Sequence, residues 1–258
     1  MLTLYVGYDP REAAAYHVFC QSVIEHASGP VKFVPLHSPM LSNFDGQRDG
    51  TNAFIYSRYL VPHYQDYQGW AIFCDGDMLV MDDIYKLYNL RDDKYGVMVV
   101  KHYYQTQNQR KYIGTPIEND NVDYERKNWS SVMLVNCGHP SNGVLSPELV
   151  SEASGSFLHR FQWLRDEQIG SLPLEWNWLV GEYPINHAKL YHHTLGSPGF
   201  EHYAQCYSSK PWNQTLLNAM TMIGERQAEI VRRAQWHHGS DNELCDTQDG
   251  DSGMAGSR

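Results

Sequence analysis

The clearest fold signal in the sequence is WAIFCDGD at residues 70–77, an apolar run that ends in two carboxylates. A short apolar run bounded by turn residues predicts a buried strand over residues 70–74. In open α/β sheets, ligands bind beyond the carboxyl ends of the strands, and Asp75 and Asp77 stand at such an end. Gly76 leaves room for a ligand to approach the backbone. The stretch therefore predicts a ligand site at the edge of a sheet.

Two carboxylates so close in sequence repel each other unless a cation or a proton lies between them. Ligation by oxygen atoms favours Mg²⁺ or Mn²⁺, which commonly bridge protein carboxylates and phosphate oxygens. The competing interpretation is a turn with solvated carboxylates, because Asp-Gly is a common turn dipeptide. The motif by itself leaves both interpretations open.

Strands and helices alternate through the first 100 residues. The predicted elements are strands over residues 2–6, 31–36, 70–74 and 95–101, and helices over residues 10–28 and 51–62. Strands that alternate with helices in short units indicate a three-layer α/β sandwich. The fold class that we expect is therefore Rossmann-like, with a mainly parallel mixed sheet.

The rest of the chain has a different pattern. Residues 103–128 form a polar segment rich in Gln, Asn and Tyr, and loops of this length are usually functional or disordered. The elements predicted beyond it are strands over residues 131–135 and 188–192 and helices over residues 156–165 and 215–236. We expect one domain over residues 1–238, followed by a disordered tail over residues 239–258.

Composition excludes several classes of protein. Twenty Lys and Arg against thirty Asp and Glu give a net charge of −10, which argues against nucleic acid as a partner. No apolar run approaches the roughly 18–20 residues of a membrane span. The five cysteines are scattered and form no C-x-x-C pair, so neither a zinc site nor a disulfide framework is indicated. Together with an N-terminus that lacks signal-peptide features, this predicts a cytoplasmic location.

Several motifs stand in an order typical of one enzyme family. A helix ending in Arg58-x-x-x-Pro62 precedes the strand with its Asp-x-Asp. The other motifs, in chain order, are LYVGYD (4–9), WSSVMLVN (129–136), DEQ (166–168), WN (176–177), HTLG (193–196) and KPW (210–212). This ordered set resembles glycosyltransferase family 8, whose members have the GT-A fold. Ser131 stands where that family usually has Gly, and the KPW motif is displaced further along the chain than usual.

The resemblance implies a metal-dependent, retaining glycosyltransferase that uses a nucleotide-sugar donor, expected to be UDP-linked. It implies a single GT-A domain, with a nucleotide-binding half over residues 1–100 and an acceptor-side half with the C-terminal helix over residues 101–238. The donor-binding residues that it implies are Val6, Gly7, Tyr8, Asp9, Arg58, Asp75, Gly76, Asp77, Gly196 and Lys210.

The resemblance makes His193 the third metal ligand beside Asp75 and Asp77. Imidazole suits Mn²⁺ better than Mg²⁺, so Mn²⁺ is the first expectation and Mg²⁺ the second. Arg58 is expected to reach either the donor phosphate or the Asp-Gly-Asp loop, because a guanidinium fork matches both.

Three donor residues have roles of their own in this interpretation. Tyr8 would stack on the nucleobase. Gly196 would let the diphosphate approach the backbone. Lys210 would neutralise the terminal phosphate, although its displaced position leaves this role open.

On the acceptor side, the family's Asp-Gln pair lies at the sugar. Glu167-Gln168 takes that place in a literal alignment, and Asp166 takes it if the alignment moves by one residue. Trp176 and Asn177 would present a ring face and an amide to a glycan or another hydroxyl acceptor. The sequence defines neither the acceptor nor the oligomeric state.

Two other functions compete with this interpretation. In a haloacid dehalogenase-type phosphatase, Asp75 would be the nucleophile and Asp77 the acid, but Leu79 replaces the usual Thr or Val and two strands precede the motif. A non-enzymatic carbohydrate-binding protein would use the two Asp residues for Ca²⁺ and the aromatic residues for sugar. Such modules are typically all-β, which the alternating pattern disfavours.

Overall fold

The computed structural model describes residues 1–37 and 52–220 of the chain. Residues 1–219 form one compact unit, and the second unit, residues 220–258, lies outside the described residues except for Met220. Three predictions fall wholly or partly outside the described residues. They are the start of the helix at Thr51, the continuation of the C-terminal helix beyond Met220, and the disordered tail over residues 239–258.

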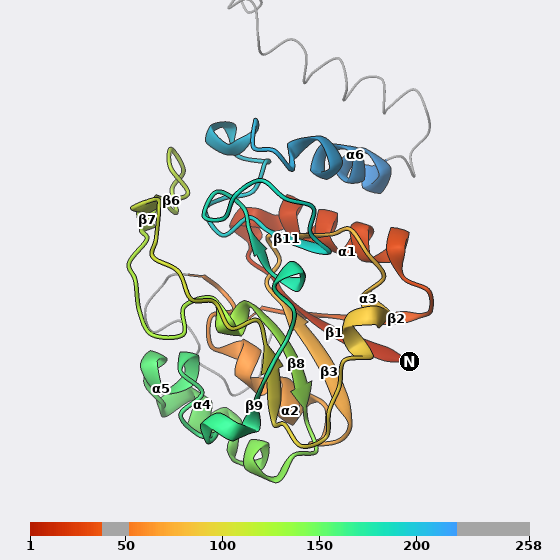
Figure 1. Cartoon of the computed structure of the whole chain (residues 1–258), viewed down its shortest axis with the longest axis vertical. Helices are drawn as coiled ribbons and strands as arrows, with labels where there is room; N and C mark the ends of the chain where they lie inside the picture. Colours follow the sequence, from red (N-terminus) through yellow and green to blue (C-terminus); the bar gives the residue numbers. More distant parts are fainter. Residues whose placement is uncertain (38–51, 221–258) are drawn as a thin grey trace, which may run out of the picture. The chain divides into compact units, whose positions relative to one another are not determined.

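A six-stranded central sheet forms the middle layer (Figure 1). Its strands are β1 (Leu2–Gly7), β2 (Val31–Leu36), β3 (Trp70–Cys74), β5 (Val97–Val99), β8 (Val132–Asn136) and β9 (Ile169–Ser171). The order is β2-β1-β3-β8-β5-β9, and β8 runs antiparallel to both of its neighbours while the remaining pairs are parallel. The predicted mainly parallel mixed sheet of a Rossmann-like α/β protein is confirmed.

Two smaller sheets lie near the carboxyl edge of this sheet. One contains β10 (Trp178–Leu179), β11 (Leu190–His192) and β4 (Met78–Val80), with β11 in the middle. The other is a hairpin of β6 (Arg110–Lys111) and β7 (Asn119–Asp120) within the polar segment. β4 follows the Asp-Gly-Asp loop directly, so its antiparallel pairing with β11 brings distant segments to that loop.

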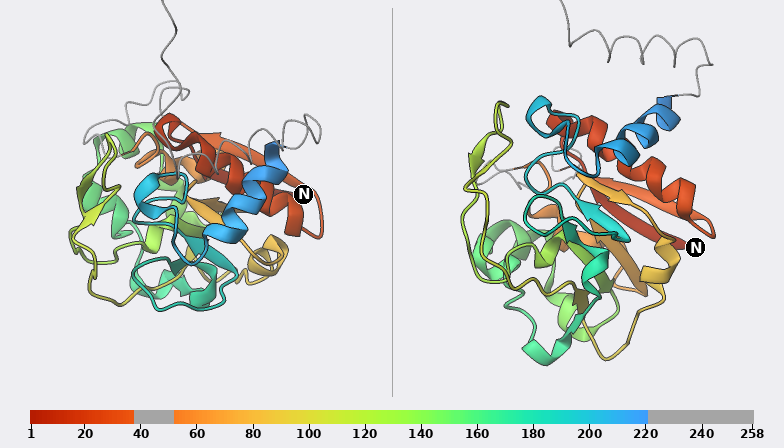
Figure 2. Two further views of the ribbon diagram at one scale, coloured as in Figure 1. Left: turned by 90° about the horizontal axis from the view of Figure 1, so that it is seen from above. Right: turned by 45° about the horizontal axis from the view of Figure 1, so that its top comes forward.

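Helices cover both faces of the central sheet. The α-helices are α1 (Ala13–His26), α2 (Val61–Tyr64), α3 (Ile84–Tyr88), α4 (Pro147–Glu152), α5 (Gly155–His159) and α6 (Ser209–Met220). Short 3-10 helices span Pro10–Glu12, Ser57–Leu60, Trp129–Ser131, Pro140–Val144, Asp166–Gln168, Leu174–Trp176 and Glu201–Tyr203. Figure 2 shows α6 beside α1, and the Asn218 side chain donates a hydrogen bond to Glu25 across the two helices at 2.7 Å.

Two predicted helices are shorter in the structure. The helix predicted over residues 51–62 becomes turns, a 3-10 helix and the four-residue α2, which has Pro62 in its first turn. The helix predicted over residues 156–165 ends at His159, and Phe161 follows with a left-handed φ of 54°. Both differences concern length and leave the layer arrangement unchanged.

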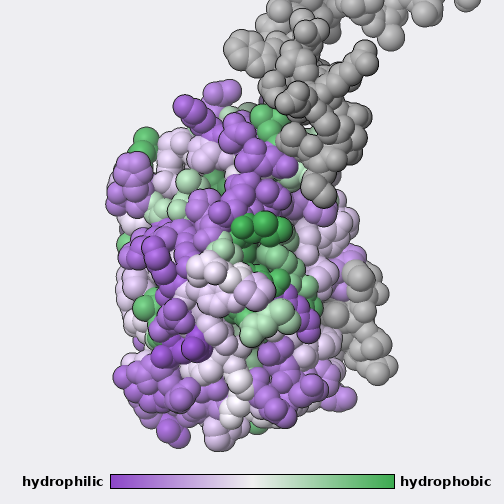
Figure 3. All heavy atoms as spheres, turned by 90° about the vertical axis from the view of Figure 1, so that its right-hand side faces the viewer, coloured by the Kyte–Doolittle hydropathy of each residue, from purple (hydrophilic) through white to green (hydrophobic). Residues whose placement is uncertain are grey.

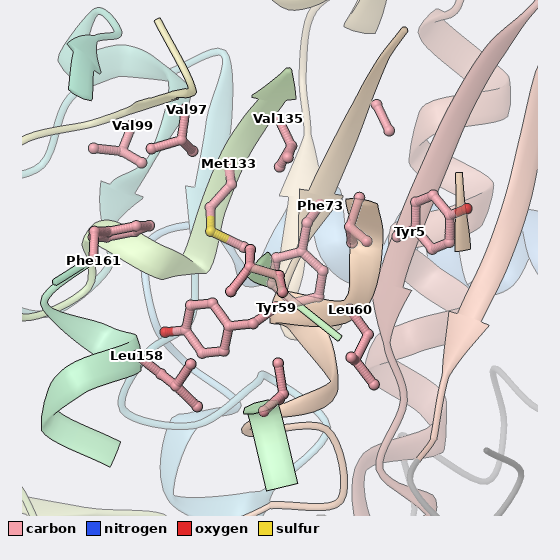
Figure 4. Close-up of a cluster of buried hydrophobic side chains, with 14 of the residues drawn as sticks. Tyr5, Tyr59, Leu60, Phe73, Val97, Val99, Met133, Val135, Leu158 and Phe161 are labelled. Atoms are coloured by element: carbon pink, nitrogen blue, oxygen red, sulfur yellow. The ribbon is translucent and has the colours of Figure 1, made fainter. Parts of the chain in front are cut away.

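The core follows the alternation of side chains along the strands. Tyr5, Phe73 and Met133 point to one face, where they pack with Tyr59 and Leu158 (Figure 4). The residues that point to the other face include Leu4, Val6, Ile72, Cys74 and Leu134, which pack with Phe19 and Val23 of α1. Burying each such side chain contributes roughly 1.5–3 kcal/mol. The two faces together fix the position of the loop that follows β3.

The long polar segment is held in place by a buried carboxylate. Glu182 accepts hydrogen bonds from the backbone N–H of Gln107 at 2.6 Å and from the Asn121 side chain at 3.0 Å. The Lys127 ammonium donates to Asn121 Oδ1 at 2.7 Å. Buried polar groups that are mutually satisfied give a segment with little apolar content a defined position.

Figure 3 shows one face of the molecule, which is mostly hydrophilic with a hydrophobic area near its middle. Across residues 1–37 and 52–220, no helix combines the length and the apolar character needed to cross a bilayer.

Candidate active site

A cavity of about 410 Å³ opens at the carboxyl ends of β1 and β3. Six parts of the chain contribute charged side chains to its lining: the loop after β1, the helix before β3, the Asp-Gly-Asp loop, the β6–β7 hairpin, the segment that carries Lys127 and the end of α5 at Arg160. The charged lining residues are Asp9, Arg11, Glu12, Arg58, Asp75, Asp77, Lys111, Asp120, Lys127 and Arg160. A pocket of this size and polarity suits a small charged ligand.

Asp75 and Asp77 lie on the wall of this cavity, and both are largely buried. Burial raises the pKa of Asp75 to about 6, while the Arg58 guanidinium opposes this rise and the charge of Asp77 adds to it. Burial acts in the same direction on Asp77, but the neighbouring His192 and other positive groups outweigh it and lower the pKa of that carboxyl. The two carboxyl groups therefore share a site, but Asp75 takes up a proton at a higher pH than Asp77.

His192 completes a group that could hold a metal ion. One ligand atom each from Asp75, Asp77 and His192 lies within 4.8 Å of the others. Oδ1 of Asp75 lies 2.9 Å from Arg58 Nη1, and Oδ1 of Asp77 lies 3.4 Å from His192 Nε2. Both oxygens are buried, and within the described residues neither accepts a well-directed hydrogen bond, so a divalent cation fits as a further partner.

The structure places His193 away from the carboxylates, which corrects the predicted third ligand. Its Nδ1 lies 3.1 Å from the backbone carbonyl oxygen of Asp77, and its Nε2 lies 2.9 Å from the Ser208 hydroxyl. His192 Nε2 lies instead 3.4 Å from Asp77 Oδ1. Successive side chains of a strand point to opposite faces. His192 and His193 therefore face in different directions, and only the His192 side chain faces the carboxylates.

Arg58 reaches the Asp-Gly-Asp loop, the second of its two predicted contacts. Its Nη1 lies 2.9 Å from Asp75 Oδ1 and also donates to the Ser130 carbonyl at 2.9 Å. The guanidinium carbon lies 5.3 Å from the ring centroid of Phe54 and 5.0 Å from that of Phe73. The Ser130 carbonyl and the two rings hold the Arg58 guanidinium against the carboxylate of Asp75.

The glycines of the predicted donor site serve close packing within the protein. A Cβ on Gly76 would collide with the carbonyl oxygen of Gly7, so the loop after β3 passes directly against the end of β1. Gly196 has a φ of 149°, and a Cβ there would collide with the Tyr203 ring. Gly76 thus packs directly against the backbone of Gly7, and the predicted approach of a ligand to Gly76 stays a prediction.

The end of β1 has mixed roles. Val6 is fully buried in the core, and Tyr8 makes edge contacts with the rings of Tyr16 and His37 without lining the cavity. Asp9 lines the cavity, but its carboxylate is engaged by Arg11 at 2.6 Å and by the backbone N–H of Ala53 at 3.1 Å. Asp9 therefore connects the loop after β1 to the start of the segment that carries Arg58.

The predicted catalytic triplet Asp166, Glu167 and Gln168 does not line the cavity. It forms the 3-10 helix immediately before β9, and β9 runs parallel to β5. Asp166 instead lines a separate pocket together with His102, Arg126 and Trp129. Asp166 pairs with Arg126 at 2.6 Å, and the Gln168 amide donates to Ser141 at 3.0 Å.

The predicted acceptor residues are also in the interior. Trp176 is 1% exposed and packs in the core below α1, and Asn177 is completely buried. Asn177 contacts His192 rather than the cavity, with Oδ1 lying 2.9 Å from His192 Nδ1. Lys210 is exposed on α6 and does not line the cavity.

Several lining residues were not singled out by sequence. Lys111 and Tyr112 come from the β6–β7 hairpin, and Glu12 comes from the 3-10 helix before α1. Burial, with the charges of Asp77 and Asp9 nearby, raises the pKa of Glu12 well above its usual value. The available signal was the unusual length and polarity of the segment that carries Lys111.

Comparisons with known proteins extend these observations. No family model matches the chain. It is 43% identical over 221 residues to Protein CDI of Arabidopsis thaliana, and the matched region covers 81% of this chain and 83% of that protein.

Solved structures with a similar fold are glycosyltransferases. The apo glycosyltransferase GlyE of Streptococcus pneumoniae TIGR4 superposes with a TM-score of 0.55 at 12% identity over 92% of this chain. The galactosyltransferase LgtC, in complex with donor and acceptor sugar analogues, gives 0.51 at 12% identity over 87% of this chain and 98% of LgtC. The chain spans 64% of the GlyE chain and 51% of the bifunctional glycosyltransferase WbbM. The chain therefore has the GT-A fold and belongs to the same family as Protein CDI of Arabidopsis thaliana.

Proposed function

We propose that this protein is a metal-dependent glycosyltransferase that moves a sugar from a nucleotide donor to a hydroxyl acceptor. The observation that carries the proposal is the grouping of Asp75, Asp77 and His192 in a cavity at the carboxyl edge of a GT-A sheet. Solved structures that share this fold are glycosyltransferases, which supports the same class of reaction. The order of motifs that resembles family 8 supports it independently.

Asp75, Asp77 and His192 would hold the cation. Two carboxylates and one imidazole suit Mn²⁺, with Mg²⁺ as the alternative. When bound, the cation would stabilise the negative charge that develops on the leaving diphosphate. Arg58 holds the Asp75 carboxylate in position for this role, and Asn177 holds the His192 ring.

The donor that we propose is a UDP-sugar, and retention of configuration at the sugar is part of the same proposal. Both come from the resemblance to family 8. Asp166, Glu167 and Gln168 receive no role at the reacting sugar, because they lie outside the cavity. The acceptor is proposed only as a glycan or another hydroxyl compound. The single GT-A domain over residues 1–238 and the cytoplasmic location stay predictions.

The test is the melting temperature of the protein with UDP, with Mn²⁺ and with both together. The wild type should melt at a higher temperature with both than with UDP alone, because a ligand that binds the folded state stabilises it. Asp77→Asn should lose this gain. Asp82→Asn is the matched control, since Asp82 lies after β4, pairs with Lys86 and does not line the cavity.

Hydrolysis of a UDP-sugar donor in the presence of Mn²⁺ provides the activity measurement. Equal, metal-independent hydrolysis by the wild type and by Asp77→Asn would contradict the proposal. A phosphorylated Asp75 trapped from a phosphate-ester substrate would favour the phosphatase instead. Sugar binding with no affinity for UDP would favour the carbohydrate-binding protein.

A further inference from the structure

Two lysines that the sequence motifs did not indicate, Lys111 and Lys127, line the cavity. Lys111 belongs to β6 of the hairpin, and its side chain lines the cavity together with Asp75, Asp77 and His192. Its Nζ donates a hydrogen bond to the Thr194 hydroxyl at 3.0 Å. An ammonium has three N–H donors, and within the described residues the Thr194 hydroxyl is the acceptor for one of them, with no carboxylate oxygen within 4.0 Å.

The other cations of the cavity are engaged by protein groups. Arg58 pairs with Asp75 and donates to two backbone carbonyls. Lys127 donates to Thr106 and Asn121 and lies 3.7 Å from a carboxylate oxygen of Asp123. Arg58 and Lys127 therefore bind other groups of the protein, whereas Lys111 has N–H donors that could bind a ligand.

The backbone around Lys111 is anchored firmly enough to position it. The hairpin pairs Lys111 with Asn119, and the next residue, Tyr112, donates its N–H to the Leu195 carbonyl at 2.6 Å. Tyr112 has a left-handed φ of 55°, which is uncommon for a non-glycine residue and needs support from the surrounding structure. The hairpin is thus fastened to the segment that follows β11 and His192.

The electrostatic setting favours an anion as the partner of Lys111. Burial and, next, the charge of Lys127 lower the pKa of its ammonium to about 8, against the opposing charges of Asp77 and Asp75. A divalent cation between the carboxylates would cancel their attraction for Lys111. The ammonium would then face a site with a surplus of positive charge, which suits a phosphate.

We propose that Lys111 binds the terminal phosphate of the leaving nucleoside diphosphate, the role that the sequence motif suggested for Lys210. This inference rests on the proposed glycosyltransferase function. In the transfer, the bond between the sugar C1 and the phosphate oxygen breaks and its electron pair stays on that oxygen. The acceptor hydroxyl oxygen bonds to C1, and its proton passes to the phosphate or to solvent. Lys111 stabilises the new phosphate charge by hydrogen bonding and keeps its own proton.

Binding of UDP and of UMP, each with Mn²⁺, tests the assignment by calorimetry. Lys111→Met should weaken UDP binding by about tenfold or more, because a hydrogen bond to a charged group is lost, and should change UMP binding little. Lys210→Met is the matched control and should change neither by more than about twofold. Lys111→Gln, which keeps a polar partner for Thr194, is the second variant should Lys111→Met fail to fold.

Binding of Mn²⁺ alone separates this role from a structural one. Removal of a positive charge near the cation site should leave Mn²⁺ affinity unchanged or raise it, whereas general damage to the site would lower it. Unchanged UDP affinity in Lys111→Gln or Lys111→Met, or a selective loss of UDP affinity in Lys210→Met, would overturn the assignment. A wild type that binds neither nucleotide would instead overturn the proposed function on which the assignment rests.

Discussion

Asn177 fixes the ring of His192: its Oδ1 lies 2.9 Å from His192 Nδ1, while its Nδ2 donates to the Ser131 hydroxyl at 2.8 Å. The contact leaves Nε2 as the ring nitrogen that faces Asp77. A partner of this kind sets the tautomer and the orientation of a metal-binding imidazole. The asparagine that the motif suggested for the acceptor therefore supports the proposed cation site.

We expect Asn177→Ala to lower Mn²⁺ affinity by about 10–100-fold, the usual effect of losing a residue that orients a ligand. Asn142→Ala is the matched control. Asn142 is as deeply buried and donates to the Gly96 and Asn136 carbonyls, away from the cavity. Both variants should be destabilised in urea, but the titration of Mn²⁺ should change only for Asn177→Ala. Equal Mn²⁺ affinities in the two variants would contradict the orienting role.

The two adjacent histidines should differ in their effect on Mn²⁺ binding. His192→Ala should reduce Mn²⁺ affinity by more than about 100-fold, because it removes a ligand, whereas His193→Ala should leave that affinity nearly unchanged. Both variants should be less stable, and His192→Ala leaves the buried Asn177 Oδ1 without its partner. His193→Ala should cost about 2–4 kcal/mol of unfolding free energy, because it leaves the Ser208 hydroxyl without its partner and opens a gap in the interior. Mn²⁺ titration and urea unfolding of both variants distinguish the two. A reversed pattern would restore His193 as the ligand.

Arg58 should be essential for the stability of the site when no metal is bound. Arg58→Met leaves the Asp75 carboxylate buried and unpaired, which should cost about 3–5 kcal/mol at pH 7. Adding Asp75→Asn to Arg58→Met should recover part of that loss. Arg110→Met removes an arginine that is half-exposed in its pairs with Glu118 and Asp120, and should cost less than about 1 kcal/mol. Urea unfolding in chelator gives all three values.

Gly76 should tolerate no side chain. Gly76→Ala places a Cβ against the Gly7 carbonyl oxygen, where backbone must move, so we expect a loss of about 2 kcal/mol or more. A Cβ on Gly143 would meet no atom within 4 Å, and Gly143 lies in a 3-10 helix away from the cavity. Gly143→Ala should therefore be nearly neutral. Thermal unfolding of the two variants makes the comparison, and equal melting temperatures would contradict the close approach.

His102 should make the protein sensitive to mild acid. Burial lowers the pKa of its imidazole to about 3, with a smaller contribution from His192, and its Nδ1 lies 2.7 Å from the Tyr183 hydroxyl. The titratable side chains that face it are those of Tyr183, Tyr104 and His192. The His102 imidazole binds a proton near pH 6.5 in the unfolded chain but not in the folded chain. The free energy of unfolding therefore has its full value above pH 6.5 and falls as the pH decreases below it.

The expected cost of the buried His102 is about 2 kcal/mol at pH 5 relative to pH 7. Urea unfolding in chelator should show the wild type losing this much more stability than His102→Gln over the same range. His193 also has a lowered pKa, of about 4, and its contribution is common to both proteins. Parallel pH profiles for the wild type and His102→Gln would contradict the prediction.

The strands around the site could be predicted from sequence because their signal is local. β2 and β3 have the predicted bounds, and β1 differs by one residue at its end. For β1 and β3 a buried apolar run between turn residues leaves little alternative to a parallel strand, whereas β2 is a partly exposed strand next to β1 at the edge of the sheet. The carboxylates of Asp75 and Asp77 follow β3 directly, so their position at the carboxyl edge followed from the same signal.

The rest of the site depends on information that one segment of sequence does not contain. The choice between His192 and His193 depends on the register of β11 against β4. The position of Asp166 depends on where β9 pairs in the sheet, beside β5. Lys111 lies in a polar segment whose place is set by tertiary contacts to Glu182 and Leu195. The order of the motifs predicted the fold and the position of the Asp-Gly-Asp loop. Strand pairing and tertiary hydrogen bonds determine which side chains face the cavity.

The pairing of β4 with β11 also couples ligand binding to folding of the whole unit. The backbone N–H of His193 donates to the Asp77 carbonyl at 2.9 Å, so the proposed cation ligands meet only after two strands from distant parts of the sequence have joined. A chain that has formed only its first three strands would have both carboxylates but no imidazole. Cation occupancy would then raise the free energy of global unfolding, and the melting temperature would depend on the cation concentration.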